Sequence, residues 1–180
     1  MRVSDPLTIP VSAVTTLIDR QAIWDLTVEY AHAADLHDGE AVAAMFADDG
    51  VLSVRTGDGA VVDLVGRDDI ASRLGALDRY RFTSHANANL VVSVDGDRAQ
   101  GRSRCTAHHF GDVDGRWVDR VAYLRYIDDY VRSDGRWWFG HRIVHIDLEE
   151  QRPVELYHWP AEAPSIGSDG ESNGSEGKAS

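Results

Sequence analysis

After about residue 80 the spacing of apolar residues changes from helical to alternating, and this change limits the folds open to the chain. Residues 84–110 alternate around the turn Asp95-Gly96-Asp97, and residues 117–150 alternate around Ser133-Asp134-Gly135. Short glycine-containing turns between alternating segments are typical of β-hairpins. We therefore predict that the second half of the chain forms long antiparallel strands.

The first half of the chain has the spacing of helices. A long helix is predicted from Ser12, a suitable N-cap, to about His37. One stripe of this helix is apolar apart from its last member and consists of Leu17, Trp24, Val28, Ala31 and Asp35. Another face, with Asp25, Glu29 and His32, is expected to meet solvent. The pattern therefore places Asp35 on the buried side of the helix.

Four short segments lie between the first helix and the long strands. Residues 38–50 predict a second helix with Val42, Met45 and Phe46 facing inward, residues 51–55 and 61–65 predict two strands, and residues 66–80 predict a third helix. Helices followed by a run of strands indicate an α+β domain. We expect a cone-shaped, curved antiparallel sheet packed against the N-terminal helices, with a cavity between the two layers.

The composition sets the limits of the domain. A single domain is predicted over residues 12–160, after a lead-in of residues 1–11. Residues 161–180 contain no aromatic side chain and are rich in Gly, Ser and acidic residues, which is typical of a disordered tail.

The charge and the rare residue types exclude several functions. The net charge of −12 argues against nucleic acid or an anionic membrane as a partner. The only lysine is Lys178 in the tail, so no lysine is available for a Schiff base. The only cysteine is Cys105, and no segment reads as a signal peptide or a membrane span. We therefore expect a cytoplasmic protein.

Four segments together resemble a known family. They are "YAHAADLHDGEAVAAMFADDG" at 30–50, "GRDDI" at 66–70, "HANANLVVSVDGDRA" at 85–99 and "DDYVRSDGRWWFGHRIVHID" at 128–147. Over residues 14–148 the chain resembles the SnoaL-like branch of the nuclear transport factor 2-like superfamily. This resemblance implies a cone-shaped α+β barrel with a deep pocket. Its members include polyketide cyclases, scytalone-type dehydratases, ketosteroid isomerases and dehydrochlorinases. The same fold also serves as the noncatalytic small subunit of ring-hydroxylating dioxygenases, so fold alone does not decide the chemistry.

The resemblance also implies roles for particular residues. In dehydratase-like and dehydrochlorinase-like members, an aspartate near the end of the first helix and a histidine on a later strand form a general-base dyad, and these map to Asp35 and His85. A second pocket histidine maps to His108 or His109, and strand alternation favours His109. Arg142 lies where some relatives have a pocket arginine.

Two departures from the family pattern limit the chemistry that the resemblance implies. Tyr30 replaces the lysine of the dehydrochlorinases, which argues against chloride elimination by that set of residues. Ala34 replaces a tyrosine of the scytalone-type enzymes.

The residues themselves support a polar site on a buried surface. A carboxylate on an apolar stripe requires a partner, because burial disfavours its charged form. His85, Asn87 and Asn89 would form a polar row on one face of a strand. The alternatives are that Asp35 reaches water at the helix end and that His85 is a core histidine bonded to a backbone carbonyl. For His108 and His109, an exposed position at the end of a strand is as well supported as a role in the pocket. Trp24 is expected to line the core or the pocket.

A metal or cofactor site is not expected. His141 and His145 lie on one strand, but no third ligand accompanies them at a suitable spacing. No glycine-rich phosphate-binding loop opens a helix after a strand.

The sequence therefore predicts a cofactor-independent acid–base enzyme. It would be a cyclase, dehydratase or isomerase acting on a small, apolar, carbonyl-containing substrate such as a polyketide or other secondary metabolite. His85 would remove a proton, Asp35 would orient His85, and Asn87, Asn89, Tyr30 or His109 would stabilise the enolate. The alternative is a noncatalytic binding or assembly module. An exposed sheet surface favours a homo-oligomer, either a dimer or a trimer.

Overall fold

The fold was analysed in a computed structural model, which describes residues 9–155. The predicted tail at 161–180, the last five residues of the predicted domain and nearly all of the lead-in lie outside this range. The helical elements are α1 (Val11–Asp35), α2 (Gly39–Ala43), α3 (Arg67–Leu74) and the 3-10 helix η1 (Gly75–Arg79). The strands are β1 (Phe46–Arg55), β2 (Val61–Val65), β3 (Phe82–Asp95), β4 (Arg98–Val113), β5 (Arg116–Ser133) and β6 (Arg136–Pro153).

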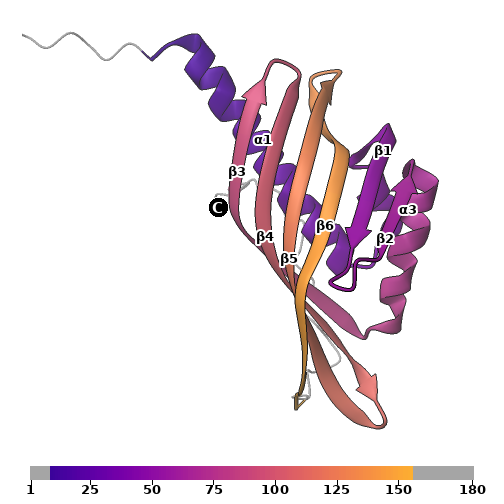
Figure 1. Cartoon of the computed structure of the whole chain (residues 1–180). Helices are drawn as coiled ribbons and strands as arrows, with labels where there is room; N and C mark the ends of the chain where they lie inside the picture. The colour runs from indigo at the N-terminus through magenta and orange to yellow at the C-terminus, as the bar shows by residue number, and fades with distance from the viewer. Residues whose placement is uncertain (1–8, 156–180) are drawn as a thin grey trace, which may run out of the picture.

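The strands form one curved, unclosed sheet in the order β2-β1-β6-β5-β4-β3. Figure 1 shows α1 lying across one face of this sheet and α3 beside β1 and β2. The predicted α+β class is confirmed, but the sheet is mixed and not wholly antiparallel, because β1 pairs with β6 in parallel. The chain passes through six further elements between these two strands, and a parallel pair requires such a long connection.

The helices differ from the predictions at their ends. The first helix begins at Val11 with Pro10 as its N-cap, one residue before the predicted Ser12. The second helix ends at Ala43, because Phe46 already pairs with Phe139 as the first residue of β1. Val42, Met45 and Phe46 are buried as predicted. No helix within residues 9–155 is long and apolar enough to cross a membrane.

The buried face of α1 is not the predicted stripe. Leu17, Trp24 and Val28 are 63%, 37% and 45% exposed. The buried residues are Asp19, Ile23, Leu26, Thr27, Tyr30, Ala31, Ala33 and Ala34. Apolar side chains lie on several sides of this helix, so hydrophobicity alone did not select the packed face. Its C-terminal half packs through alanines, whose small side chains permit a close approach to the sheet.

A β-bulge in β3 changes which residues face the helices. Ala88 pairs with Arg104 and Val91 pairs with Arg102, so Asn89 and Leu90 together oppose one residue of β4. Asn89 has a φ of 56°, a left-handed conformation that asparagine tolerates better than most residues. Before the bulge the inward side chains are odd-numbered, and after it they are even-numbered. Asn89 is consequently exposed, and the predicted polar row ends at Asn87.

A second irregularity occurs where β5 pairs with β6. Leu124 pairs with Ile146 and Tyr123 pairs with Leu148, so Asp147 is an extra residue in β6. Simple alternation would place Leu148 on the inner face with Ile146. Because of the extra residue, Leu148 is instead exposed and Glu149 lies opposite Ala122 on the inner face.

Candidate active site

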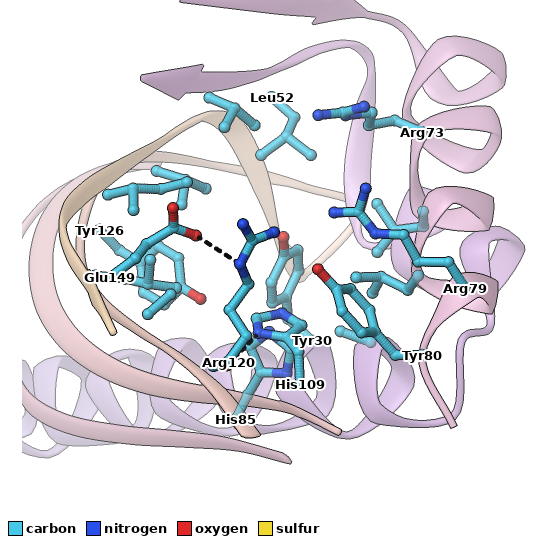
Figure 2. Close-up of a pocket in the computed structure, with 18 residues that line it drawn as sticks. Tyr30, Leu52, Arg73, Arg79, Tyr80, His85, His109, Arg120, Tyr126 and Glu149 are labelled. Carbon is cyan, nitrogen blue, oxygen red and sulfur yellow. Dashed lines mark hydrogen bonds and ion pairs between the residues drawn. The ribbon is translucent and has the colours of Figure 1, made fainter. Parts of the chain in front are cut away.

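A cavity of about 200 Å³ lies between the sheet and the helical layer, in the predicted position. Figure 2 shows the side chains that line it. Aliphatic side chains form much of the wall, and they are Ala34, Leu52, Val54, Leu74, Leu77, Ala122, Leu124, Val144 and Ile146. The polar lining consists of Tyr30, Arg73, Arg79, Tyr80, His85, His109, Arg120, Tyr126 and Glu149.

Asp35 is the last residue of α1 and points its carboxylate at β3. Its Oδ1 accepts hydrogen bonds from His85 Nδ1 at 2.6 Å and from the Thr83 hydroxyl at 3.1 Å. Its Oδ2 accepts from the backbone N–H of His85 at 3.0 Å. Burial raises the pKa of Asp35, but the hydrogen bonds from His85 and Thr83 outweigh it and hold the pKa below its ordinary value. Asp35 is therefore a charged acceptor at neutral pH.

His85 is oriented by this carboxylate. It lies on the inner face of β3, and its side chain is 9% exposed. Because Oδ1 of an ionised carboxylate can only accept, Nδ1 of His85 carries the proton in this contact. Nε2 of the neutral ring then holds a lone pair, and the ring lines the cavity.

His109 lies next to His85, but its Nδ1 donates to a different kind of acceptor. The two rings meet edge to face with 5.7 Å between their centroids. Nδ1 of His109 donates to the backbone carbonyl of Arg120 at 3.2 Å, and its ring packs on Tyr80 at a centroid distance of 4.8 Å. Burial, reinforced by the nearby positive groups, lowers the pKa of His109 to about 4. His109 is thus neutral at pH 7 and offers an acceptor at Nε2, not a donor.

His108, the other candidate for the second histidine, lies on the opposite side of β4. Its Nδ1 is 2.9 Å from Asp119 Oδ2, which also accepts from Arg152. His108 does not line the cavity.

Tyr30 reaches the cavity from α1. Its ring packs edge-on against the rings of Phe46, Tyr126 and Phe139. Burial raises the pKa of Tyr30, with Arg142 acting in the opposite direction, so its hydroxyl stays protonated and can donate a hydrogen bond.

Arg142 is fully buried but does not line the cavity. Its guanidinium donates to both carboxylate oxygens of Asp128, at 2.8 Å and 2.9 Å, and it lies about 4.2 Å from the centre of the Tyr30 ring. Removal of one partner from a buried ion pair typically lowers the free energy of unfolding by about 3–5 kcal/mol. Arg142 therefore packs behind the aromatic wall of the cavity, and its predicted role in substrate binding stays a prediction.

The other side chains predicted to bind substrate include Asn87, Asn89 and Trp24. Asn87 is half-buried and donates from Nδ2 to the backbone carbonyl of Thr27, so it ties β3 to α1. Asn89 is turned outward by the bulge, and Trp24 lies on the outer side of α1. None of the three side chains lines the cavity.

Six polar residues of the cavity lining were not predicted from the sequence, namely Arg73, Arg79, Tyr80, Arg120, Tyr126 and Glu149. Arg120 could have been found, because it shares the alternation of the buried Ala122 and Leu124. Glu149 could not, because the extra residue in β6 reverses its face. The positions of Arg73, Arg79 and Tyr80 depend on how α3 and η1 pack over the cavity. No local sequence pattern specifies that packing.

Within residues 9–155, no three or more His, Cys, Asp or Glu side chains are grouped so that they could hold a metal ion.

Comparison with known protein families and structures gives several similarities. The family described as "SnoaL-like domain" matches residues 15–143. A protein of Novosphingobium aromaticivorans, provisionally described as a scytalone dehydratase, is 28% identical with a TM-score of 0.67, and the match covers 84% of this chain and 99% of that one. A protein of the same organism, provisionally described as an aromatic ring hydroxylase, is 26% identical with a TM-score of 0.64. That match covers 82% of this chain and 96% of that one.

A type 2 hexachlorocyclohexane dehydrochlorinase shares the fold at 20% identity and a TM-score of 0.66, covering 86% of this chain and 99% of that one. The search of curated proteins gave no match.

Proposed function

The chain belongs to the SnoaL-like domain family, and we propose that it is an acid–base enzyme that acts on a small carbonyl-containing compound without a cofactor. The reaction would be a dehydration, an isomerisation or a cyclisation that begins with removal of a proton next to the carbonyl. The observation that carries this proposal is the 2.6 Å contact between Asp35 Oδ1 and His85 Nδ1 at the wall of a cavity.

His85 is the proposed general base. Its Nε2 would accept the substrate proton, and the charge that forms on the ring would be balanced by Asp35, which already accepts the Nδ1 proton. Because three hydrogen bonds fix Asp35, the ring needs little reorientation before the reaction.

Tyr30 is the proposed donor to the enolate oxygen. Its protonated hydroxyl lines the same cavity as His85. His109 is better suited to accept a hydrogen bond from a substrate hydroxyl, because its Nδ1 proton is already held by Arg120. Asn87 and Asn89, which do not line the cavity, are left out of the mechanism.

The competing function is a noncatalytic assembly module. Such a protein does not need an open cavity or an oriented histidine, and its interior could be filled with side chains. The open volume beside the Asp35–His85 pair favours the enzyme.

Proton exchange tests the proposal without knowledge of the substrate. Purified protein would be incubated in D₂O with small ketones, and deuterium at the α-carbon would be followed by NMR. We expect His85→Gln and Asp35→Asn to lower the exchange rate by about 10²- to 10⁴-fold. Glu29→Gln, at an exposed carboxylate of the same helix, is the matched control and should keep the wild-type rate.

Circular dichroism would show that the variants are folded. Wild-type exchange in folded His85→Gln would contradict the proposal, and so would wild-type protein that exchanges no faster than buffer.

A further inference from the structure

The cavity contains an unusual concentration of positive charge. The chain as a whole has 30 acidic residues and 18 basic ones. Yet Arg73, Arg79 and Arg120 line one small cavity, and Glu149 is the only acidic residue among its lining side chains. Such local reversal of the overall charge is expected where a negatively charged ligand binds.

Of the three arginines, Arg120 faces Glu149 and Tyr80, and Arg73 and Arg79 are the less neutralised. Arg120 Nε lies 4.0 Å from Glu149 Oε1, which is a long separation for an ion pair. Within residues 9–155, no carboxylate forms an ion pair with Arg73 or Arg79. Arg79 instead lies over the ring of Tyr80, with its guanidinium carbon 4.8 Å from the ring centre. The guanidinium donors of Arg73 and Arg79 therefore remain available to an anion.

The arginines of the α3–η1 segment and the ring of His85 come from different sides of the cavity. Figure 2 shows Arg73 and Arg79 projecting from the α3–η1 segment toward the guanidinium of Arg120, whose side chain passes beside His109. Aliphatic side chains such as Leu52, Leu77 and Leu124 line the wall. A ligand that fits this arrangement has an apolar body with an anionic group at one end.

The size of the cavity limits the ligand further. A volume of about 200 Å³ is smaller than the roughly 300–1,000 Å³ of pockets that hold drug-sized molecules. Guanidinium groups bind carboxylates in a planar, two-point geometry.

We propose that the substrate is a small carboxylate with an apolar body, whose carboxylate is bound by Arg79 and Arg120 while its reacting carbon faces His85. This inference rests on the proposed acid–base function, and it adds an anionic group to the small apolar, carbonyl-containing substrate predicted from the sequence.

Binding of model ligands tests this inference directly. Benzoate, benzamide and phenyl phosphate would each be titrated into the full-length protein by isothermal calorimetry. Benzoate and benzamide have the same ring and differ in charge. We expect benzoate to bind at least about tenfold more tightly than benzamide, because charged hydrogen bonds contribute more than neutral ones. Raised ionic strength should weaken benzoate binding and leave benzamide binding unchanged.

Variants locate the anion site. Arg79→Gln and Arg120→Gln should each weaken benzoate binding about tenfold and change benzamide binding little. Arg102→Gln removes a positive charge from an exposed position of β4 outside the cavity and should bind benzoate like the wild type. Arg79 is exposed, so its replacement provides a test even if Arg120→Gln fails to fold.

Several outcomes would overturn the inference. These are equal binding of benzoate and benzamide, no benzoate binding at millimolar concentration, unchanged benzoate binding in folded Arg79→Gln, or tighter binding of phenyl phosphate than of benzoate.

Asp35→Asn separates this inference from the proposed function. If it binds benzoate as the wild type does but has lost proton exchange, both proposals are supported. Arginine-dependent benzoate binding in a wild-type protein without proton exchange would refute only the acid–base function. Dyad-dependent exchange with no preference for benzoate would refute only the anion site.

Discussion

His85 and His109 illustrate how the partner of one ring nitrogen decides what a histidine can do. Both rings line the same cavity, and each donates its Nδ1 proton. The acceptor for His85 is a charged carboxylate, which stabilises a protonated ring. The acceptor for His109 is a neutral backbone carbonyl, and burial lowers the pKa of His109 to about 4. His109 is therefore suited to remain neutral, whereas the Asp35 carboxylate holds His85 with its Nδ1 protonated.

The low pKa of His109 predicts a pH-dependent stability. In the unfolded chain a histidine has a pKa of about 6.5, so between that pH and about 4 the unfolded state binds more protons than the folded state. The free energy of unfolding should thus fall as pH is lowered through this window, by about 1–3 kcal/mol from His109. Urea unfolding of wild type and His109→Gln at several pH values would measure this, and the variant should lose less stability. Parallel curves for the two proteins would contradict the prediction.

At the scale of the elements, two irregularities in the strands decide which side chains face inward. The bulge at Asn89 turns that side chain outward and brings Leu90, Val92 and Val94 against the core. The extra residue Asp147 turns Glu149 inward beside Arg120. A change of one residue in register reverses every later side chain of a strand, so alternation read along the sequence is reliable only up to the first bulge.

The bulge in β3 limits which residue types position 89 can accept. Its φ of 56° is accessible to glycine and asparagine but unfavourable for a β-branched residue. We expect Asn89→Val to lower the free energy of unfolding by about 1–2 kcal/mol and Asn89→Gly to change it by less. Urea denaturation of both variants would measure the difference. Equal stabilities would show that the left-handed conformation is not required.

At the scale of the whole molecule, the sheet has one covered face and one open face. The helices cover the inner face, where the cavity lies. Exposed apolar side chains occur on the strands, among them Val91, Tyr123, Ile127 and Leu148. Burial of such side chains against a second copy would stabilise an assembly by the hydrophobic effect.

We therefore expect the protein to form a dimer or a trimer in solution. Light scattering coupled to size-exclusion chromatography would measure the mass, and Ile127→Arg should shift it toward that of a monomer. Val113→Arg, a charge introduced at an exposed apolar residue near the end of β4, is the control and should leave the mass unchanged. A monomeric wild-type protein would contradict the expectation.

The sequence by itself determined the class of fold, the hairpins and the need of Asp35 for a partner, whereas the choice of His85 as that partner followed from the family resemblance. These depend on local periodicity, on turn residues and on the need of a buried carboxylate for a partner. Only the tertiary structure decided the packed face of α1, the parallel pairing of β1 with β6 and the outward turn of Asn89. It also decided the arginine-rich lining of the cavity. The physical reason is that strand register and helix packing depend on contacts between residues far apart in the chain, which local patterns do not specify.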